Sequence, residues 1–127
     1  MISAAFYSIW GVTMMRPENI GGSSTSILRI TWRWETWAAF KGRVIAGVRE
    51  IRERFPTGAV VSVFTSGGPV SAVLQHALKT PDKVALDLGW IIKNGSLTEF
   101  KYKGDRFTLT GFNMTPHYTD AGLVTYR

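Results

Sequence analysis

The chain contains no cysteine among its 127 residues. Disulfide bonds, thiolate metal sites and cysteine nucleophiles are therefore excluded, and a reducing, cytoplasmic location is the expectation. Histidine is also scarce, because only His76 and His117 are present. Two histidines without a cluster of carboxylates nearby make a poor metal site, so we expect neither a metal nor another cofactor.

Long hydrophobic runs and blocks of like charge are missing as well. The apolar-rich residues 1–15 are too short to span a bilayer and lack the basic start of a signal peptide, so no membrane partner is expected. The net charge is +6, yet acidic residues interrupt the basic ones, and no run of five like charges occurs. We therefore expect no nucleic-acid partner.

The hydrophobic content is high enough to build a core. At 45% hydrophobic residues, the chain has the composition and length of one domain. We interpret residues 1–31 as a divergent N-terminal segment and linker. Within it, residues 1–13 fit either a strand or a short helix, and the Gly- and Ser-rich residues 21–26 form a connector. Residues 32–127 are expected to form the folded part.

Helical spacing dominates the middle of the chain. Apolar residues recur every three to four positions over residues 34–55, which predicts a long amphipathic helix. The apolar residues 60–64 follow as a strand that we expect to be covered on both faces. Helical spacing resumes at Pro69, expected at the first helical position. A short helical segment through Leu88 is expected after it, with Thr80 as its cap.

The last third has the pattern of a β-meander. Residues 89–93, 97–102 and 107–112 are the expected strands, and Asn94-Gly95 is a dipeptide typical of hairpin turns. The alternation of helices and strands predicts an α/β fold, a truncated three-layer α/β/α sandwich with a β-rich C-terminal third.

The turn between the strand at 60–64 and the next helix is the most informative segment. Here Thr65, Ser66, Gly67 and Gly68 lead from a buried strand into a helix N-terminus. Unpaired backbone N–H groups and the positive end of the helix dipole then point at one place, which favours an anion. A tight turn that needs small residues is the structural alternative.

Several segments, in order and at similar spacing, resemble the C-terminal half of the histidine phosphatase (phosphoglycerate mutase-like) family. The branch it resembles has Phe-Thr-Ser-Gly-Gly-Pro as its second motif. The segments that carry the resemblance are Phe40…Arg43-Val44, Val63–Val70, Trp90…Asn94-Gly95-Ser96-Leu97-Thr98, Phe112-Asn113…His117 and Val124-Thr125-Tyr126-Arg127.

The resemblance implies phosphoryl transfer through a phosphohistidine in a three-layer α/β/α sandwich. In that family an Arg-His-Gly motif after the first strand supplies the nucleophile, and a second histidine, arginines and an acidic residue complete the pocket. This chain has no Arg-His-Gly, and Ser66 stands at the position of the second histidine. We therefore expect the N-terminal half, with the first strand, to be missing and the family mechanism not to run.

Three candidate roles stay open at single residues. By resemblance, Arg43 supports the anion pocket, through an ion pair or directly; the alternative is a solvated arginine. His117 is the one candidate catalytic base, against a structural loop histidine. The tryptophans at 32, 34 and 37 are interpreted as core or interface residues.

The sequence thus predicts a degenerate, non-catalytic histidine-phosphatase-like protein that retains a weak phosphate-binding turn. Two alternatives are a slow phosphatase acting on small phosphate esters and an oligomerising or partner-binding scaffold. A chain that lacks half of its parent sheet exposes a strand edge, and such edges pair. We therefore expect a homodimer or a protein partner at that edge.

Overall fold

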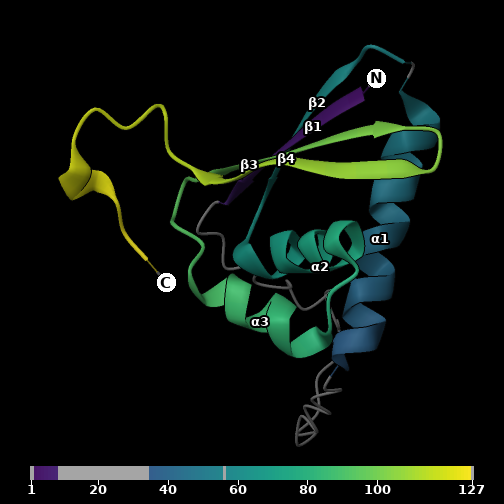
Figure 1. Cartoon of the computed structure of the whole chain (residues 1–127), viewed down its shortest axis with the longest axis horizontal. Coiled ribbons are helices and arrows are strands. Elements are labelled where there is room, and N and C mark those ends of the chain that lie inside the picture. The colour runs from purple at the N-terminus through teal and green to yellow at the C-terminus, as the bar shows by residue number, and fades with distance from the viewer. Residues whose placement is uncertain (1, 9–34, 56, 127) are drawn as a thin grey trace, which may run out of the picture.

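The computed structural model describes residues 2–8, 35–55 and 57–126, which form a mixed α/β structure (Figure 1). The expected α/β class and the β-rich C-terminal third are confirmed. The elements in chain order are β1 (Ile2–Ser8), α1 (Trp37–Arg54), β2 (Val60–Thr65), α2 (Gly67–Leu78), α3 (Asp82–Trp90), β3 (Leu97–Lys103), β4 (Arg106–Met114) and a short 3-10 helix, η1 (Ala121–Leu123).

The described strands form one sheet in the order β2-β1-β3-β4. β1 runs parallel to β2 and antiparallel to β3. Our expectation that the first strand is missing was therefore wrong. Two alanines and two serines give residues 2–8 a weak strand preference, so the local sequence left strand and helix open. Residues 2–8 form a strand because β2 and β3 pair with its two edges. The expected connector at residues 21–26 lies outside the described residues.

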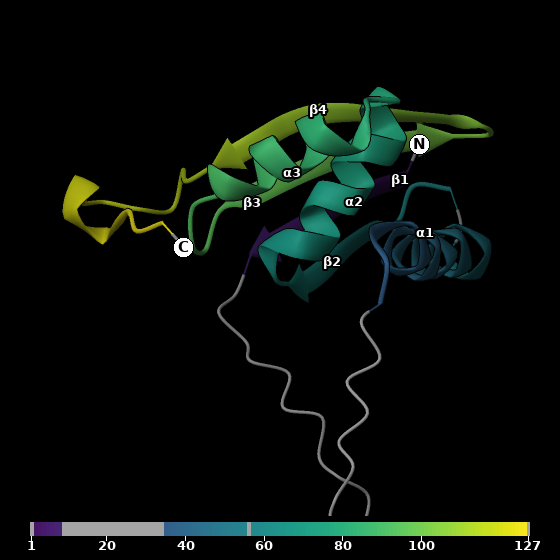
Figure 2. The same ribbon diagram turned by 90° about the horizontal axis from the view of Figure 1, so that it is seen from below.

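The three described α-helices lie on one face of the sheet (Figure 2). α2 packs on the sheet, and α1 and α3 pack on α2. The core between these layers contains seven buried residues: Val48, Val70, Val73, Leu74, Ile92, Phe100 and Tyr102. Burial of this apolar surface is the main force that holds the helices on the sheet.

The strand β2 departs from the expectation of a strand covered on both faces. It is the terminal strand of the sheet, and its side chains alternate between half-buried and exposed. Val60 is 76% exposed, and Phe64, which points to the same face, is 64% exposed. Within the described part of the chain no helix covers this outer face. The sequence of β2 does not show this alternation of exposed and half-buried residues, because both faces of the strand carry β-branched or aromatic residues.

The predicted long helix is confirmed as α1. Thr36 caps it, since the Thr36 hydroxyl accepts a hydrogen bond of 3.2 Å from the Ala39 amide. Helix α2 begins at Gly67, two residues earlier than expected, so Pro69 is its third residue and not its first. This shift matters for the site, because it places both glycines in the first turn of the helix.

Helix α3 corrects two expectations. Its N-cap is Pro81, not Thr80, and it continues through Trp90, so residues 89–93 are not a strand. A β-carbon at Gly89 would lie 2.6 Å from the Ser71 hydroxyl oxygen, so a glycine is needed where α3 crosses α2. This close helix contact keeps an apolar segment helical although its composition is typical of a strand.

The dipeptide Asn94-Gly95 does not form the expected hairpin. Instead Asn94 binds the C-terminal tail, because its backbone N–H and its side-chain amide each donate to Thr125, both at 2.9 Å. The true hairpin joins β3 to β4 through Gly104, which has a positive φ of 55°. Among the described helices, none is long and apolar enough to cross a membrane.

Candidate anion-binding site

The turn between β2 and α2 consists of Thr65, Ser66, Gly67 and Gly68. Thr65 ends β2 and pairs with Ser8 at the end of β1. Ser66 is the N-cap of α2 with an extended backbone, and its side chain makes no capping hydrogen bond. The first helical bond runs from the Val70 amide to the Ser66 carbonyl oxygen at 3.5 Å.

Two amides are therefore available at this helix end. The N–H groups of Gly67 and Gly68 belong to the first turn, where a helix has no internal acceptor, and no acceptor for them occurs in the described part of the chain. With the Ser66 hydroxyl they offer three donors at the positive end of a 12-residue helix. The structure thus brings together the turn residues that the sequence singled out.

A small hollow of about 130 Å³ lies against this turn. Its walls come from all three described helices and include two tryptophans, one of which, Trp90, is 72% exposed. The lining residues are Trp37, Gly67, Gly68, Ser71, Leu86, Gly89 and Trp90.

Arg43 is held outside the hollow. Its guanidinium donates to both carboxylate oxygens of Glu35, at 2.7 and 3.2 Å, and this pair lowers the pKa of Glu35, chiefly through the hydrogen bond. The guanidinium also lies 5.3 Å above the centre of the Phe40 ring. That ring in turn packs against Gly68. A β-carbon at Gly68 would lie 3.4 Å from the nearest carbon of the Phe40 ring. Arg43 therefore reaches the turn only indirectly, by way of its contact with Phe40.

His117 lies in the turn after β4, at the same end of the sheet as the β2–α2 turn but beyond the far strand. Thr65 pairs with Ser8 on β1, and β4 ends at Met114, opposite Leu97 of β3. Three strand spacings of ~4.8 Å separate β2 from β4, or about 14 Å. His117 is exposed and packs edge-on against the Tyr118 ring at 4.5 Å.

His76 is also not placed to act as a catalytic base at the β2–α2 turn. It lies in the last turn of α2, at the opposite end of that helix from Ser66. Burial beside Phe107 and the nearby cations of Arg52, Arg49 and Lys79 lower its pKa. Among the described residues no group of three His, Asp or Glu side chains is placed to hold a metal ion.

Gln75 fixes the three helices around the hollow, a role that the sequence did not suggest. It is buried, accepts a hydrogen bond from the Trp37 indole N–H at 2.9 Å, and donates to Asp82 at 2.6 Å and to the Thr80 carbonyl at 3.1 Å. The pKa of Asp82 is lowered chiefly by the bond from Gln75 and further by Lys41. The signal for this role in the sequence was a glutamine within the apolar stripe of a helix.

We predict that Gln75→Ala lowers the free energy of unfolding by about 2 kcal/mol, since three hydrogen bonds at ~0.5–1.5 kcal/mol each are lost. Urea denaturation followed by tryptophan fluorescence measures the loss, and NMR titration should show the pKa of Asp82 rising. The exposed ion pair of Lys83 with Asp87 provides the control, because Lys83→Ala should change stability by less than about 0.5 kcal/mol. Equal effects of the two substitutions would contradict the assigned role.

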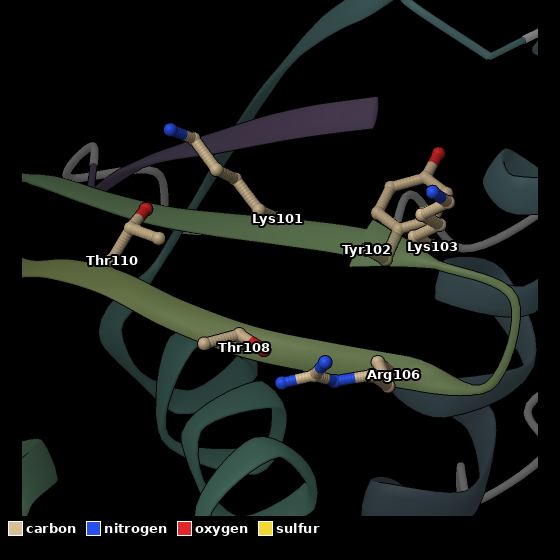
Figure 3. A pocket seen from close by; sticks show the side chains of 6 residues that line it. All are labelled: Lys101, Tyr102, Lys103, Arg106, Thr108 and Thr110. Carbon is tan, nitrogen blue, oxygen red and sulfur yellow. The ribbon is translucent and has the colours of Figure 1, made fainter. Parts of the chain in front are cut away.

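A second hollow, of about 290 Å³, lies over the hairpin of β3 and β4 (Figure 3). Three cations line it, and Lys103 stands directly opposite Arg106 in the ladder. Like charges at such positions repel, and three cations together make this surface attractive to anions. The strand-like spacing of Lys101 and Lys103 was the sequence signal for it.

The comparisons with known proteins agree with this fold. The model of the histidine phosphatase superfamily (branch 1) matches residues 10–115. The solved structure of Bacillus stearothermophilus YhfR is similar with a TM-score of 0.57 and 22% sequence identity, over 68% of this chain. The chain spans 42% of that YhfR chain. No curated protein matches it. Because the family model covers most of the sequence, the chain belongs to branch 1 of the histidine phosphatase superfamily.

Proposed function

We propose that this chain is a non-catalytic, cytoplasmic member of its superfamily whose β2–α2 turn binds a phosphate group weakly. The observation that carries the proposal is the pair of available amides of Gly67 and Gly68 beside the uncommitted Ser66 hydroxyl. Backbone N–H groups at a helix N-terminus are a common phosphate-binding arrangement.

Weak binding is expected because none of the described residues that line the hollow carries a positive charge. Helix-terminal charges contribute ~0.3–1 kcal/mol at exposed sites and up to ~2 kcal/mol in partly buried ones. Arg43, which resemblance made a candidate for the pocket, is engaged with Glu35. A phosphate group would therefore depend on the two amides, the Ser66 hydroxyl and the helix dipole.

The absence of catalysis is proposed from the residues that the mechanism needs. The family nucleophile follows the first strand as Arg-His-Gly, whereas this chain has Ile9, Trp10 and Gly11 after β1. Neither imidazole replaces it, because His76 lies at the far end of α2 and His117 lies beyond β3. Phosphoryl transfer needs a positioned nucleophile and cations around the phosphate oxygens, and the described turn offers neither.

Binding can be tested by thermal stabilisation. We predict that millimolar phosphate or sulfate raises the Tm of the chain above that in chloride of equal ionic strength. Ser66→Glu should abolish this rise, because it places a carboxylate at the anion position. Thr57→Glu makes the same charge change on an exposed residue near the other end of β2 and should preserve the rise. An equal response of all three proteins would contradict binding at the turn.

Hydrolysis of an aryl phosphate from acidic to neutral pH tests the slow-phosphatase alternative. We expect no turnover above that of a His117→Ala control. Turnover that His117→Ala abolishes would show a rebuilt active site and would overturn the non-catalytic proposal, without bearing on whether the turn binds phosphate.

A further inference from the structure

We propose that a hollow between α1 and the C-terminal end of α2 binds a small organic carboxylate, with its apolar part on α1 and its carboxylate beside Lys79. The hollow has a volume of about 470 Å³ and lies where the last turn of α2 meets α1 (Figure 1). The β2–α2 turn lies at the other end of α2. The proposal therefore goes beyond the proposed phosphate binding and does not depend on it.

The wall that α1 contributes is a shallow apolar strip. Ala38, Gly42 and Ile45 line the hollow at helical spacing, so they share one face of α1. A β-carbon built at Gly42 would meet no atom within 4 Å, so the space above this glycine is open. An aliphatic or aromatic group of a ligand can lie on this strip and replace water there.

The wall that follows α2 carries a cation and a hydroxyl group. Lys79 lines the hollow and makes no ion pair with a described residue. It is the C-cap of α2 with a positive φ of 53°, where glycine is the usual residue. Thr80 also lines the hollow, and its hydroxyl is buried without a hydrogen-bond partner among the described residues. A carboxylate in the hollow would supply the hydroxyl with an acceptor and Lys79 with a counter-charge.

A singly charged head group suits this hollow better than a doubly charged phosphate. The hollow lies at the C-terminal end of α2, which is the negative end of the helix dipole and disfavours negative charge. Of the two lysines that line the hollow, Lys41 lies 3.5 Å from Asp82, so Lys79 remains to balance the ligand. One cation balances one carboxylate, which is why we propose a carboxylate.

The two histidines of the chain allow binding to be measured by NMR, because His76 lines the hollow and His117 does not. Benzoate should move the ring resonances of His76 in a saturable way and raise its pKa, since a nearby anion stabilises the imidazolium. In the free protein that pKa is lowered by burial and then by the cations Arg52, Arg49 and Lys79, and the charges of Lys41 and Asp82 face each other nearby. The resonances of His117 should stay unchanged.

Acetate separates the roles of the apolar strip and the carboxylate. It has the same charge as benzoate but no ring to lie on the strip, so it should need roughly tenfold or more of the benzoate concentration for the same shift. Chloride at equal ionic strength should leave His76 unchanged. Equal responses of His76 to benzoate, acetate and chloride would show screening by salt and would overturn the proposal.

Two glycines of α1 provide a blocking variant and its matched control. Gly42→Phe fills the hollow, whereas Gly47→Phe makes the same change on the same helix outside the hollow. A β-carbon at either glycine meets nothing within 4 Å, so both variants should fold with similar Tm. Benzoate should shift His76 in Gly47→Phe and not in Gly42→Phe. The proposal fails if both variants bind benzoate equally, or if His76 of the unchanged chain does not respond.

Substitutions at the charged wall test where the carboxylate lies. Lys79→Gly removes the cation and the unfavourable backbone conformation together, so the Tm should rise while benzoate affinity falls roughly two- to fivefold. Thr80→Val removes a hydroxyl that has no described partner, so it should weaken benzoate binding without lowering the Tm. Unchanged affinity in both variants would overturn the placement of the carboxylate beside Lys79.

Discussion

Phe100→Ala is expected to lower the free energy of unfolding by about 3–5 kcal/mol, the usual cost of removing a phenylalanine from a packed core. Phe100 has no exposed surface and lies at the centre of β3. Its ring stacks on Phe107 with the ring centres 5.0 Å apart. The substitution would leave a cavity between the sheet and α2 that neighbouring side chains fill only in part.

Chemical denaturation monitored by circular dichroism measures this loss. Thr108→Ala is the matched control, because Thr108 is exposed on the adjacent strand β4, and it should change stability by no more than ~0.5 kcal/mol. The loss of stability caused by Phe100→Leu should lie between the losses caused by Phe100→Ala and Thr108→Ala. A loss for Phe100→Ala as small as that for Thr108→Ala would mean that the core does not centre on Phe100.

Gly95→Ala is expected to cost about 3 kcal/mol, more than the same change at Gly104. Both glycines have positive φ, 68° and 55°, where an L-residue pays ~1–2 kcal/mol. A β-carbon at Gly95 would also stand 2.2 Å from the Tyr118 hydroxyl, whereas Gly104 has nothing within 4 Å. Tyr118 must then move and lose its 2.6 Å hydrogen bond to the Asn94 carbonyl, worth ~1 kcal/mol.

A double-mutant cycle isolates the contact. Tyr118→Phe removes the hydroxyl, so Gly95→Ala should cost less in that background than in the unchanged chain. Denaturation measures the four stabilities, and proteolysis reports release of the tail, because Tyr118 and Thr125 both bind Asn94. If the losses of stability from the two substitutions are additive, the cost of Gly95→Ala comes from the positive φ and not from the contact with the Tyr118 hydroxyl.

Local patterns in the sequence were sufficient for some elements. The spacing that predicted a helix over residues 34–55 corresponds to α1, because an amphipathic stripe and the Thr36 cap act within a few residues of one another. The apolar run of β2 and the small residues of the β2–α2 turn were also readable, since a strand that leads into a glycine-rich helix start is a local feature.

Contacts between distant segments decided the elements that were predicted wrongly. β1 has a weak strand preference and is a strand because β2 and β3 pair with both of its edges. Residues 89 and 90 are helical because Gly89 lies against Ser71. Neither partner is near in sequence, so no pattern within residues 2–8 or 89–93 contains the information.

The same division applies to the candidate site. The sequence by itself determined the exclusion of cysteine chemistry, the absence of an Arg-His-Gly nucleophile and the donors at Ser66, Gly67 and Gly68, since these follow from residue types and neighbouring positions. Only the tertiary structure decided that Arg43 is bound by Glu35 and that His117 lies across the sheet from the turn. The physical reason is that a side chain's partner depends on how strands and helices pack, and packing joins residues far apart in the chain.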